Sequence, residues 1–273
     1  MKKKIAITMC FMLLLFATCM IVPQQQEHAP TEYFATSFNG ASDFTDKVFT
    51  VSYVNRTPSG KSLALVTPDY IVPNVTCVPI AGANILGFYD RFCTELIPNF
   101  TPGVVYAGSY YVYNAYDDNV TNAALLLASD MGITNPSTQG ATVADCKTGF
   151  NKYCARKSYS VSFDSAMQSK SFSYDKAKSQ INAGKPIILF CSEFNLAVIG
   201  QQTNIDRVVL HTCKDPHAMV AFGYSEYKYT LSNGSTRVDS YLDVATGVNI
   251  LKTAKIYMGS DIIIDDAYAV TIS

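Results

Sequence analysis

The sequence has little charge, few histidines and no excess of charge of either sign. Only 16% of its 273 residues are charged, and the formal net charge is -1. Nucleic-acid binding needs many Lys and Arg residues on one face, so this composition argues against a nucleic-acid partner. The sequence also has no internal repeat and no low-complexity tract. With 48% hydrophobic residues, it predicts a folded globular protein with a substantial core.

The N-terminus has the order of a secretory signal peptide. Lysines at positions 2–4 precede the apolar run Ile5–Val22, and a basic start before an apolar segment is typical of export signals. We therefore expect residues 1–22 to be a signal peptide and the protein to be secreted or extracellular. Two alternatives stay open, because the run is long enough for a membrane anchor and Cys19 could carry a lipid.

The remaining chain predicts an α+β fold. Residues 23–60 are polar and are expected to be a leader or an edge strand, followed by one domain over residues 61–273. In this domain the expected helices precede most of the expected strands. The helices are expected at Cys77–Cys93, Thr121–Met131, Thr142–Tyr153 and Tyr174–Ala183. The strands are expected at Ile187–Phe190, His217–Leu231, Arg237–Ala245 and Ile262–Ile272.

The first of these helices is expected to have one apolar face, which would pack against the sheet. The residues of that face fall at helical spacing. They are Ala81, Ile85, Phe88 and Phe92.

Six cysteines follow the expected signal peptide, at irregular spacing. They are Cys77, Cys93, Cys146, Cys154, Cys191 and Cys213. An even number in an exported protein permits disulfides. Cys146 and Cys154 are eight residues apart on an expected helix, which places them about 12 Å apart. Bridged Cα atoms lie within about 7 Å, so these two cannot pair while the helix holds. The pattern indicates neither a disulfide scaffold nor a zinc site.

Cys77 stands where a loop becomes a helix, in the stretch NVTCVPIAGANILGFYDRF. The N-terminus of a helix carries a partial positive charge and free N–H groups, which stabilise a thiolate and lower its pKa. Pro79 is tolerated there because its missing N–H has no helical acceptor. Cys77 is therefore a candidate nucleophile with a solvent-facing thiol. The alternative is a buried cysteine that begins an ordinary helix.

Only three histidines are available as a base for Cys77. His28 lies in the polar leader, His211 is expected in a loop, and His217 begins the apolar run HAMVAFGY. A histidine at the start of a strand that faces a helix N-terminus has the geometry of a thiolate–imidazolium pair. His217 is the candidate base, and a hydrogen-bonded core histidine is the alternative. The close spacing of His211, Cys213, Asp215 and His217 makes a poor tetrahedral metal site.

The two motifs together resemble the papain-like cysteine peptidase superfamily. The sequence CVPIAGANILGFYD, followed about 140 residues later by DPHAMVAFGY, is similar to the bacterial C39-like and streptopain-like branches. The resemblance covers residues 61–273. It implies a helical N-terminal half whose central helix bears the nucleophile and packs on a C-terminal antiparallel sheet. It also implies that Cys77 attacks a carbonyl carbon and that His217 carries the proton.

The chain departs from this family at the oxyanion donor and at the third catalytic residue. The family supplies a glutamine upstream of the cysteine, but no Gln lies between Gln26 and Gln139. Asn74 is the nearest amide donor, and it is also a good turn residue. Alignment on Gly247 places Ala245 where the family has the residue that orients the histidine. Asp243, two residues earlier, is the candidate for that role, with a surface carboxylate as the alternative.

The resemblance implies an exported thiol hydrolase that cleaves peptide or other amide bonds, without a cofactor or a metal. Its partner is then a peptide or protein substrate, and contact with a membrane is expected only through a lipid or signal anchor. The departures keep a second reading open, a catalytically silent papain-like module that binds peptides or cell-surface ligands. A third is a purely structural surface protein. The sequence leaves the oligomeric state open.

Overall fold

The computed structural model describes residues 44–63, 68–100, 104–107, 110–113, 118–248 and 253–273. The segments predicted as a signal peptide (1–22) and as most of the polar leader (23–43) lie outside these residues. The described chain combines helices with one large antiparallel sheet, so the α+β class is confirmed. None of its helices is both long and apolar enough to cross a membrane.

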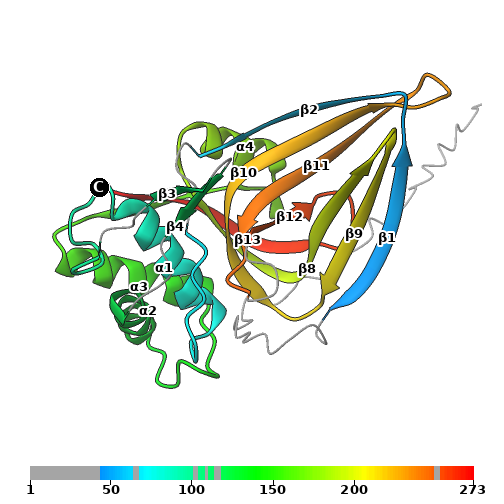
Figure 1. Ribbon diagram of the computed structural model, residues 1–273. Helices are drawn as coiled ribbons and strands as arrows, with labels where there is room; N and C mark the ends of the chain where they lie inside the picture. The colour runs from blue at the N-terminus through cyan, green and yellow to red at the C-terminus, as the bar shows by residue number, and fades with distance from the viewer. Residues whose placement is uncertain (1–43, 64–67, 101–103, 108–109, 114–117, 249–252) are drawn as a thin grey trace, which may run out of the picture. The chain divides into compact units, whose positions relative to one another are not determined.

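Three helices pack on one another and a fourth stands apart from them (Figure 1). The helices are α1 (Cys77–Tyr89), α2 (Asp118–Asp130), α3 (Val143–Arg156) and α4 (Tyr174–Asn182). Side chains fix where two of them begin. The Thr142 hydroxyl accepts from the Asp145 N–H while the Asp145 carboxylate accepts from the Thr142 N–H, which is a capping box at the start of α3. Ser173 caps α4, as the sequence predicted.

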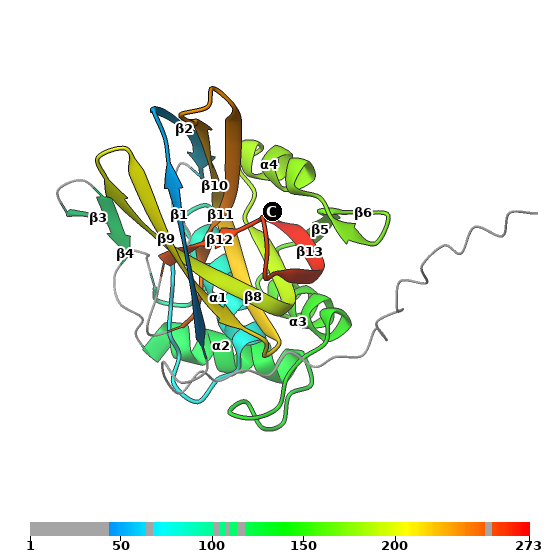
Figure 2. The same cartoon turned by 90° about the vertical axis from the view of Figure 1, so that its right-hand side faces the viewer.

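Nine strands form the main antiparallel sheet, in the order β1-β9-β8-β12-β11-β10-β2, with β13 paired to β8 and β5 paired to β13 (Figure 2). The first three of these strands along the chain are β1 (Thr45–Ser52), β2 (Asn55–Ser62) and β5 (Val161–Ser165). The others are β8 (Ile187–Gln202), β9 (Ile205–Cys213), β10 (His217–Thr230), β11 (Thr236–Ala245), β12 (Thr253–Tyr257) and β13 (Ile263–Ile272). Two small hairpins also form. They are β3 (Val104–Ala107) with β4 (Tyr110–Tyr113), and β6 (Met167–Gln168) with β7 (Ser171–Phe172).

Strand β8 is much longer than the expected strand Ile187–Phe190. Its first part pairs with β10 and β13, and its second part pairs with β9. Its buried start at Ile187–Cys191 is followed by two partly exposed residues, by the buried run Phe194–Ala197 and by a mostly exposed end. Because β8 changes partners along its length, its first part lies beside the start of β10.

Strands β1 and β2 occupy the two ends of the strand order, where β1 pairs with β9 and β2 pairs with β10. The predicted boundary between residues 60 and 61 cuts through β2. In the described chain, residues 45–62 are therefore part of the sheet as edge strands, which is one of the two readings that the sequence left open.

Helix α1 packs on β10 and is buried along its entire length. Small residues allow this close approach. At Gly82 a Cβ atom would lie 2.3 Å from the Leu127 side chain, and at Gly87 it would lie 2.6 Å from the Tyr70 hydroxyl. The prediction that Phe92 belongs to the apolar face of this helix is wrong. The helix ends at Tyr89, and Phe92 is 64% exposed.

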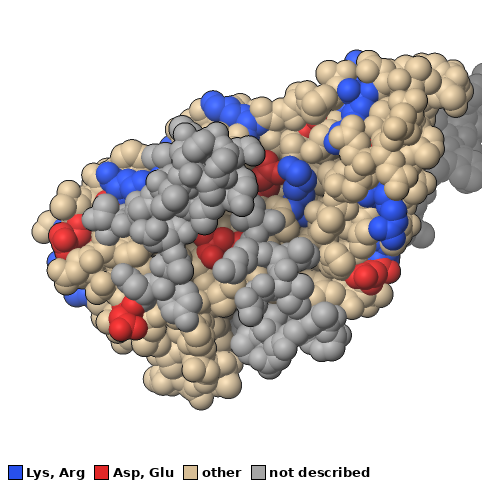
Figure 3. Space-filling view, in the orientation of Figure 1, with Lys and Arg blue, Asp and Glu red and all other residues tan. Residues whose placement is uncertain are grey.

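Charged side chains are sparse and scattered on the face of the molecule shown in Figure 3. Lys and Arg side chains lie there among uncharged residues, and some stand next to Asp or Glu. The arrangement on this face agrees with the low charge content of the sequence.

Candidate active site

Cys77 is the first residue of α1, and the loop before it is held from two sides. The Thr76 N–H donates to the Pro136 carbonyl at 2.8 Å, and the Thr76 hydroxyl donates to the Gln139 carbonyl at 3.0 Å. Thr76 has an extended backbone and acts as the N-cap residue, so Cys77 lies in the first turn. The expectation of a solvent-facing thiol is wrong, because Cys77 is only 2% exposed.

His217 is the first residue of β10 and is also buried, at 2% exposure. Its Nε2 atom lies 2.8 Å from the backbone carbonyl oxygen of Thr246, and its ring lies 5.2 Å from that of Phe194. A carbonyl oxygen can only accept, so Nε2 must carry the proton. In the neutral ring Nδ1 is then the nitrogen that can take a proton, as a general base requires.

Burial keeps the His217 ring neutral. Loss of solvation lowers the pKa of His217 from 6.5 to about 4, while the hydrogen bond to Thr246 raises it by less. At neutral pH the structure therefore favours a neutral imidazole. The thiolate–imidazolium pair expected from the sequence is not the resting state that this environment stabilises.

The starts of α1 and β10 meet beside β8. His217 is paired with Cys191 across the sheet, and Cys77 lies close enough to Cys191 to raise the pKa of that thiol, after the larger effects of burial and Asp265. On the other side, a Cβ atom at Gly247 would lie 3.1 Å from Ile80 in the first turn of α1. The same region of the fold therefore contains Cys77, His217 and the segment after β11.

Asp69 holds the backbone segment that contacts His217. Its two carboxylate oxygens accept from the N–H of Thr246 at 3.0 Å and from the N–H of Gly247 at 2.7 Å. Gly247 has a φ of +67°, which glycine adopts readily. Asn84 on α1 accepts from the Tyr70 N–H at 2.7 Å and so anchors the residue next to Asp69. Asp69 is a functional candidate that sequence reasoning missed.

Asp243 lies away from His217 and does not take the role predicted for it. It pairs with Gly223, six residues beyond His217 on β10, which corresponds to about 20 Å along a strand. Its carboxylate forms an ion pair with Lys255 and accepts from Ser225 at 3.2 Å. The acceptor at His217 is the backbone carbonyl of Thr246, one residue after the expected position at Ala245.

Asn74 occupies an exposed turn after Pro73, with a φ of +58°. Asparagine tolerates this left-handed conformation better than most residues. Its place therefore agrees with the turn role that the sequence left open, and its role as an oxyanion donor stays a prediction.

His211 lies in β9 rather than in the expected loop. Its Nδ1 atom is 2.6 Å from an Asp46 carboxylate oxygen on the neighbouring strand β1. Over the described part of the chain, no group of three or more His, Cys, Asp or Glu residues is arranged to hold a metal ion. All six described cysteines are buried, and no two of them form a disulfide with each other, including Cys146 and Cys154 on α3.

Comparisons with known proteins add no family to this picture. No protein-family model, curated protein or solved structure matches the chain.

We expect the buried His217 to make stability depend on pH. Between the folded pKa of about 4 and the ordinary value of 6.5, only the unfolded chain binds the proton. The contribution of His217 is thus complete above the ordinary value and is lost as the pH falls towards the folded one. The full loss amounts to about 3 kcal/mol of unfolding free energy. Urea unfolding of the wild type at a series of pH values measures it.

The control for this measurement is His217→Gln, which cannot titrate in this range. The contribution of Asp90 to the pH dependence must be separated from that of His217. Burial raises the pKa of Asp90 to about 6, which makes stability change with pH in the opposite direction. The difference between the two proteins removes this contribution. Equal pH dependence in wild type and variant would contradict a neutral, buried His217.

Proposed function

We propose that the chain is an exported papain-like thiol hydrolase that cleaves peptide or other amide bonds. The observation that carries the proposal is the hydrogen bond between His217 Nε2 and the Thr246 carbonyl. It fixes the tautomer in which Nδ1 can accept a proton, at a histidine that begins a strand packed on the helix that Cys77 opens.

In the proposed reaction His217 Nδ1 takes the thiol proton as Cys77 Sγ attacks the substrate carbonyl carbon. The negative charge then moves to the carbonyl oxygen, and the backbone N–H of Cys77 is the proposed donor to it. His217 returns the proton to the amine, which leaves as the C–N bond breaks. A water molecule next releases the acyl group from sulfur, with His217 again acting as the base and then returning the proton to sulfur.

The burial of Cys77 and His217 favours a second candidate. A thiol that is 2% exposed cannot meet a substrate carbonyl until its surroundings open. A catalytically silent papain-like module that binds peptides would not need such an opening. The two functions differ in whether the Cys77 thiol reacts.

Thiol labelling combined with a peptide-cleavage assay tests the proposal. Treatment with iodoacetamide at neutral pH is expected to modify Cys77 first. The fraction of activity lost on an unstructured peptide should equal the fraction of Cys77 that is modified. Cys146 and Cys191 are expected to react last, because burial raises the pKa of both thiols. Mass spectrometry of digested samples identifies the modified residue.

A Cys146→Ala variant is the matched control, since it removes a buried thiol on α3 and leaves Cys77 in place. It should label and cleave as the wild type does. Protein that cleaves no peptide and leaves Cys77 unlabelled would support the silent module instead.

We also expect Asp69→Asn to slow the reaction through His217. An asparagine can accept from only one of the two N–H groups, and its amide donor would face the other, so the Thr246 segment loses its fixed position. The kcat value should fall roughly tenfold or more while KM changes little. Hydrogen exchange at the Gly247 amide should become faster in the same variant.

Asp164→Asn is the control for this prediction, because it removes a surface carboxylate that pairs only with Lys185 among the described ion pairs. It should change neither kcat nor Gly247 exchange. A full kcat in Asp69→Asn, with faster exchange at Gly247, would show that the hydrogen bonds from Asp69 to the Thr246 segment do not matter for the reaction.

A further inference from the structure

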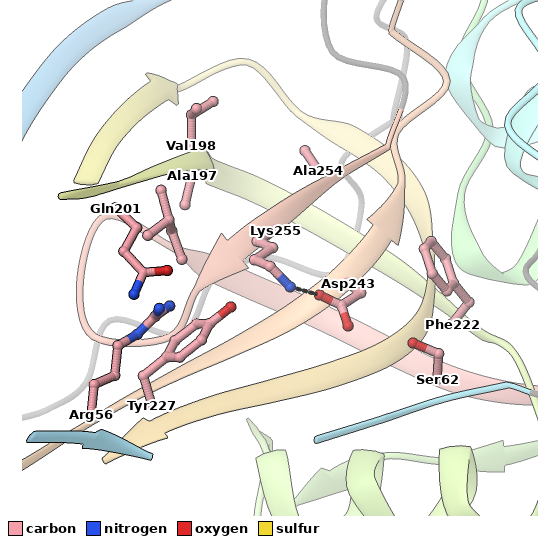
Figure 4. A pocket seen from close by; sticks show the side chains of 11 residues that line it. Arg56, Ser62, Ala197, Val198, Gln201, Phe222, Tyr227, Asp243, Ala254 and Lys255 are labelled. Atoms are coloured by element: carbon pink, nitrogen blue, oxygen red, sulfur yellow. Dashed lines mark hydrogen bonds and ion pairs between the residues drawn. The ribbon is translucent and has the colours of Figure 1, made fainter. Parts of the chain in front are cut away.

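A cavity lies in the sheet, apart from the candidate active site. Its volume is about 590 Å³, and its walls come from β2, β8, β10, β11 and β12 (Figure 4). None of Cys77, His217 and Asp69 lines it. Cavities of this size with a few convergent polar groups commonly bind small molecules.

Hydrogen-bond donors gather at one end of the cavity. Figure 4 shows Arg56, Gln201 and Tyr227 close together there, each from a different strand. Arg56 is held in place from two sides, because its guanidinium lies 4.1 Å from the centre of the Tyr227 ring and its Nε atom lies 2.8 Å from the buried Asp206 carboxylate. A preorganised guanidinium with its terminal N–H groups on a cavity suits a carboxylate.

Hydrogen-bond acceptors lie at the other end. There Asp243 stands near Ser62, and Lys255 separates the pair from the donor end (Figure 4). Lys255 and Ser225 both donate to Asp243 Oδ1. The second oxygen, Oδ2, faces Gly223, where a Cβ atom would lie 2.8 Å from it and 2.7 Å from the Ser62 hydroxyl oxygen. A side chain at this position would collide with both oxygens, so glycine leaves room for them beside the cavity.

The charges of the cavity balance in pairs. Arg56 is paired with Asp206, and Lys255 is paired with Asp243. A ligand with a net charge would bring an uncompensated charge into the cavity. A ligand with one positive and one negative end brings no net charge. Ala197, Ile199 and Phe222 add apolar surface to the lining of the cavity.

We propose that this cavity binds a zwitterionic ligand, namely a short peptide with both termini free. The ligand carboxylate accepts from Arg56, Gln201 and Tyr227, and the ligand ammonium donates to Asp243 Oδ2 and Ser62. Apolar ligand side chains pack on Ile199 and Phe222. This site is independent of the proposed hydrolysis.

Calorimetric titration with the dipeptide Leu-Leu tests the proposal, with Cys77→Ala in the full chain as the receptor so that hydrolysis cannot consume the ligand. Two modified dipeptides separate the ends, because N-acetylation removes the ammonium and C-amidation removes the carboxylate. Each modification is expected to weaken binding roughly tenfold or more, as expected for the loss of a charge-assisted hydrogen bond.

Two further substitutions locate the site, each with a matched control. Tyr227→Phe removes only the hydroxyl and keeps the ring under Arg56, and Gln201→Ala removes the amide. Both should weaken Leu-Leu binding several-fold. Tyr224→Phe on the same strand and Gln202→Ala on the same strand as Gln201 lie outside the cavity and should bind as the parent protein does.

The result that overturns the proposal is no heat of binding with Leu-Leu, or equal affinity for the free and the doubly blocked dipeptide. Equal losses in the cavity variants and their controls would overturn it as well. Because the receptor lacks Cys77, these outcomes do not depend on whether the chain is a hydrolase.

Discussion

Replacement of Cys77 by Ala is expected to abolish hydrolysis completely. In the proposed mechanism the sulfur forms the covalent bond to the substrate, and the Ala methyl group has no lone pair with which to replace it. No other described cysteine stands at the start of a helix that packs on β10. We expect kcat/KM on an unstructured peptide to fall to the uncatalysed background, measured by chromatography of the products.

Stability must be measured on the same variant, because Cys77 is buried. Loss of the sulfur should cost about 1 kcal/mol of unfolding free energy, which leaves the protein folded at room temperature if its stability is ordinary. Cys191→Ala is a demanding control, since that residue is also buried and lies beside His217. It should lose similar stability and keep its activity. A folded Cys77→Ala protein with full activity would remove Cys77 from the mechanism.

The helices could be predicted from the sequence because local chemistry marks their ends. Ser173 caps α4, and Gly184 follows it with a φ of +84°, a conformation that favours glycine. The sequence predicts helix α1 as far as Cys93, beyond its actual end at Tyr89, because Phe92 continues the apolar spacing. The spacing alone does not show that the chain leaves the helix at Asp90, whose carboxylate accepts from the Ile97 N–H.

Strand β2 could not be predicted from the sequence because it is exposed. Strand β2 reads NRTPSGKS and is exposed along nearly all of its length, so it has no buried face to produce an alternating pattern. Its place in the sheet depends on backbone pairing with β10. The second part of β8, which pairs with β9, begins with the buried residues Phe194–Ala197, so exposure does not explain why the prediction ends at Phe190.

The residues of the candidate site also differ in whether the sequence could predict them. Cys77 and His217 were predictable as candidates because a thiol at a helix start and a rare histidine at a strand start are chemically distinctive. The group that orients His217 is a backbone carbonyl, which any residue at position 246 would supply. Asp69 acts on backbone N–H groups of a segment more than a hundred residues away, and no local pattern marks such a contact.

Replacement of His217 by Ala is expected to be the second most damaging change. The variant loses the group that takes the thiol proton and returns it to the leaving amine, so kcat/KM should fall roughly 10²–10⁴-fold. His211→Ala removes a histidine whose ring bonds Asp46 near the sheet edge, and it should cost little. Both values come from the same peptide assay.

A loss of activity in His217→Ala could also follow from disturbed packing, because the ring lies against Phe194 in the core. Added imidazole separates the two causes. The substitution leaves a cavity of about the size of the missing ring, and free imidazole bound there can again carry the proton. Partial recovery that rises with imidazole concentration, and that is missing in Cys77→Ala, would assign His217 the role of the base. A dead His211→Ala enzyme beside an active His217→Ala enzyme would instead transfer that role to His211, and with it the location of the reaction to the β1–β9 edge.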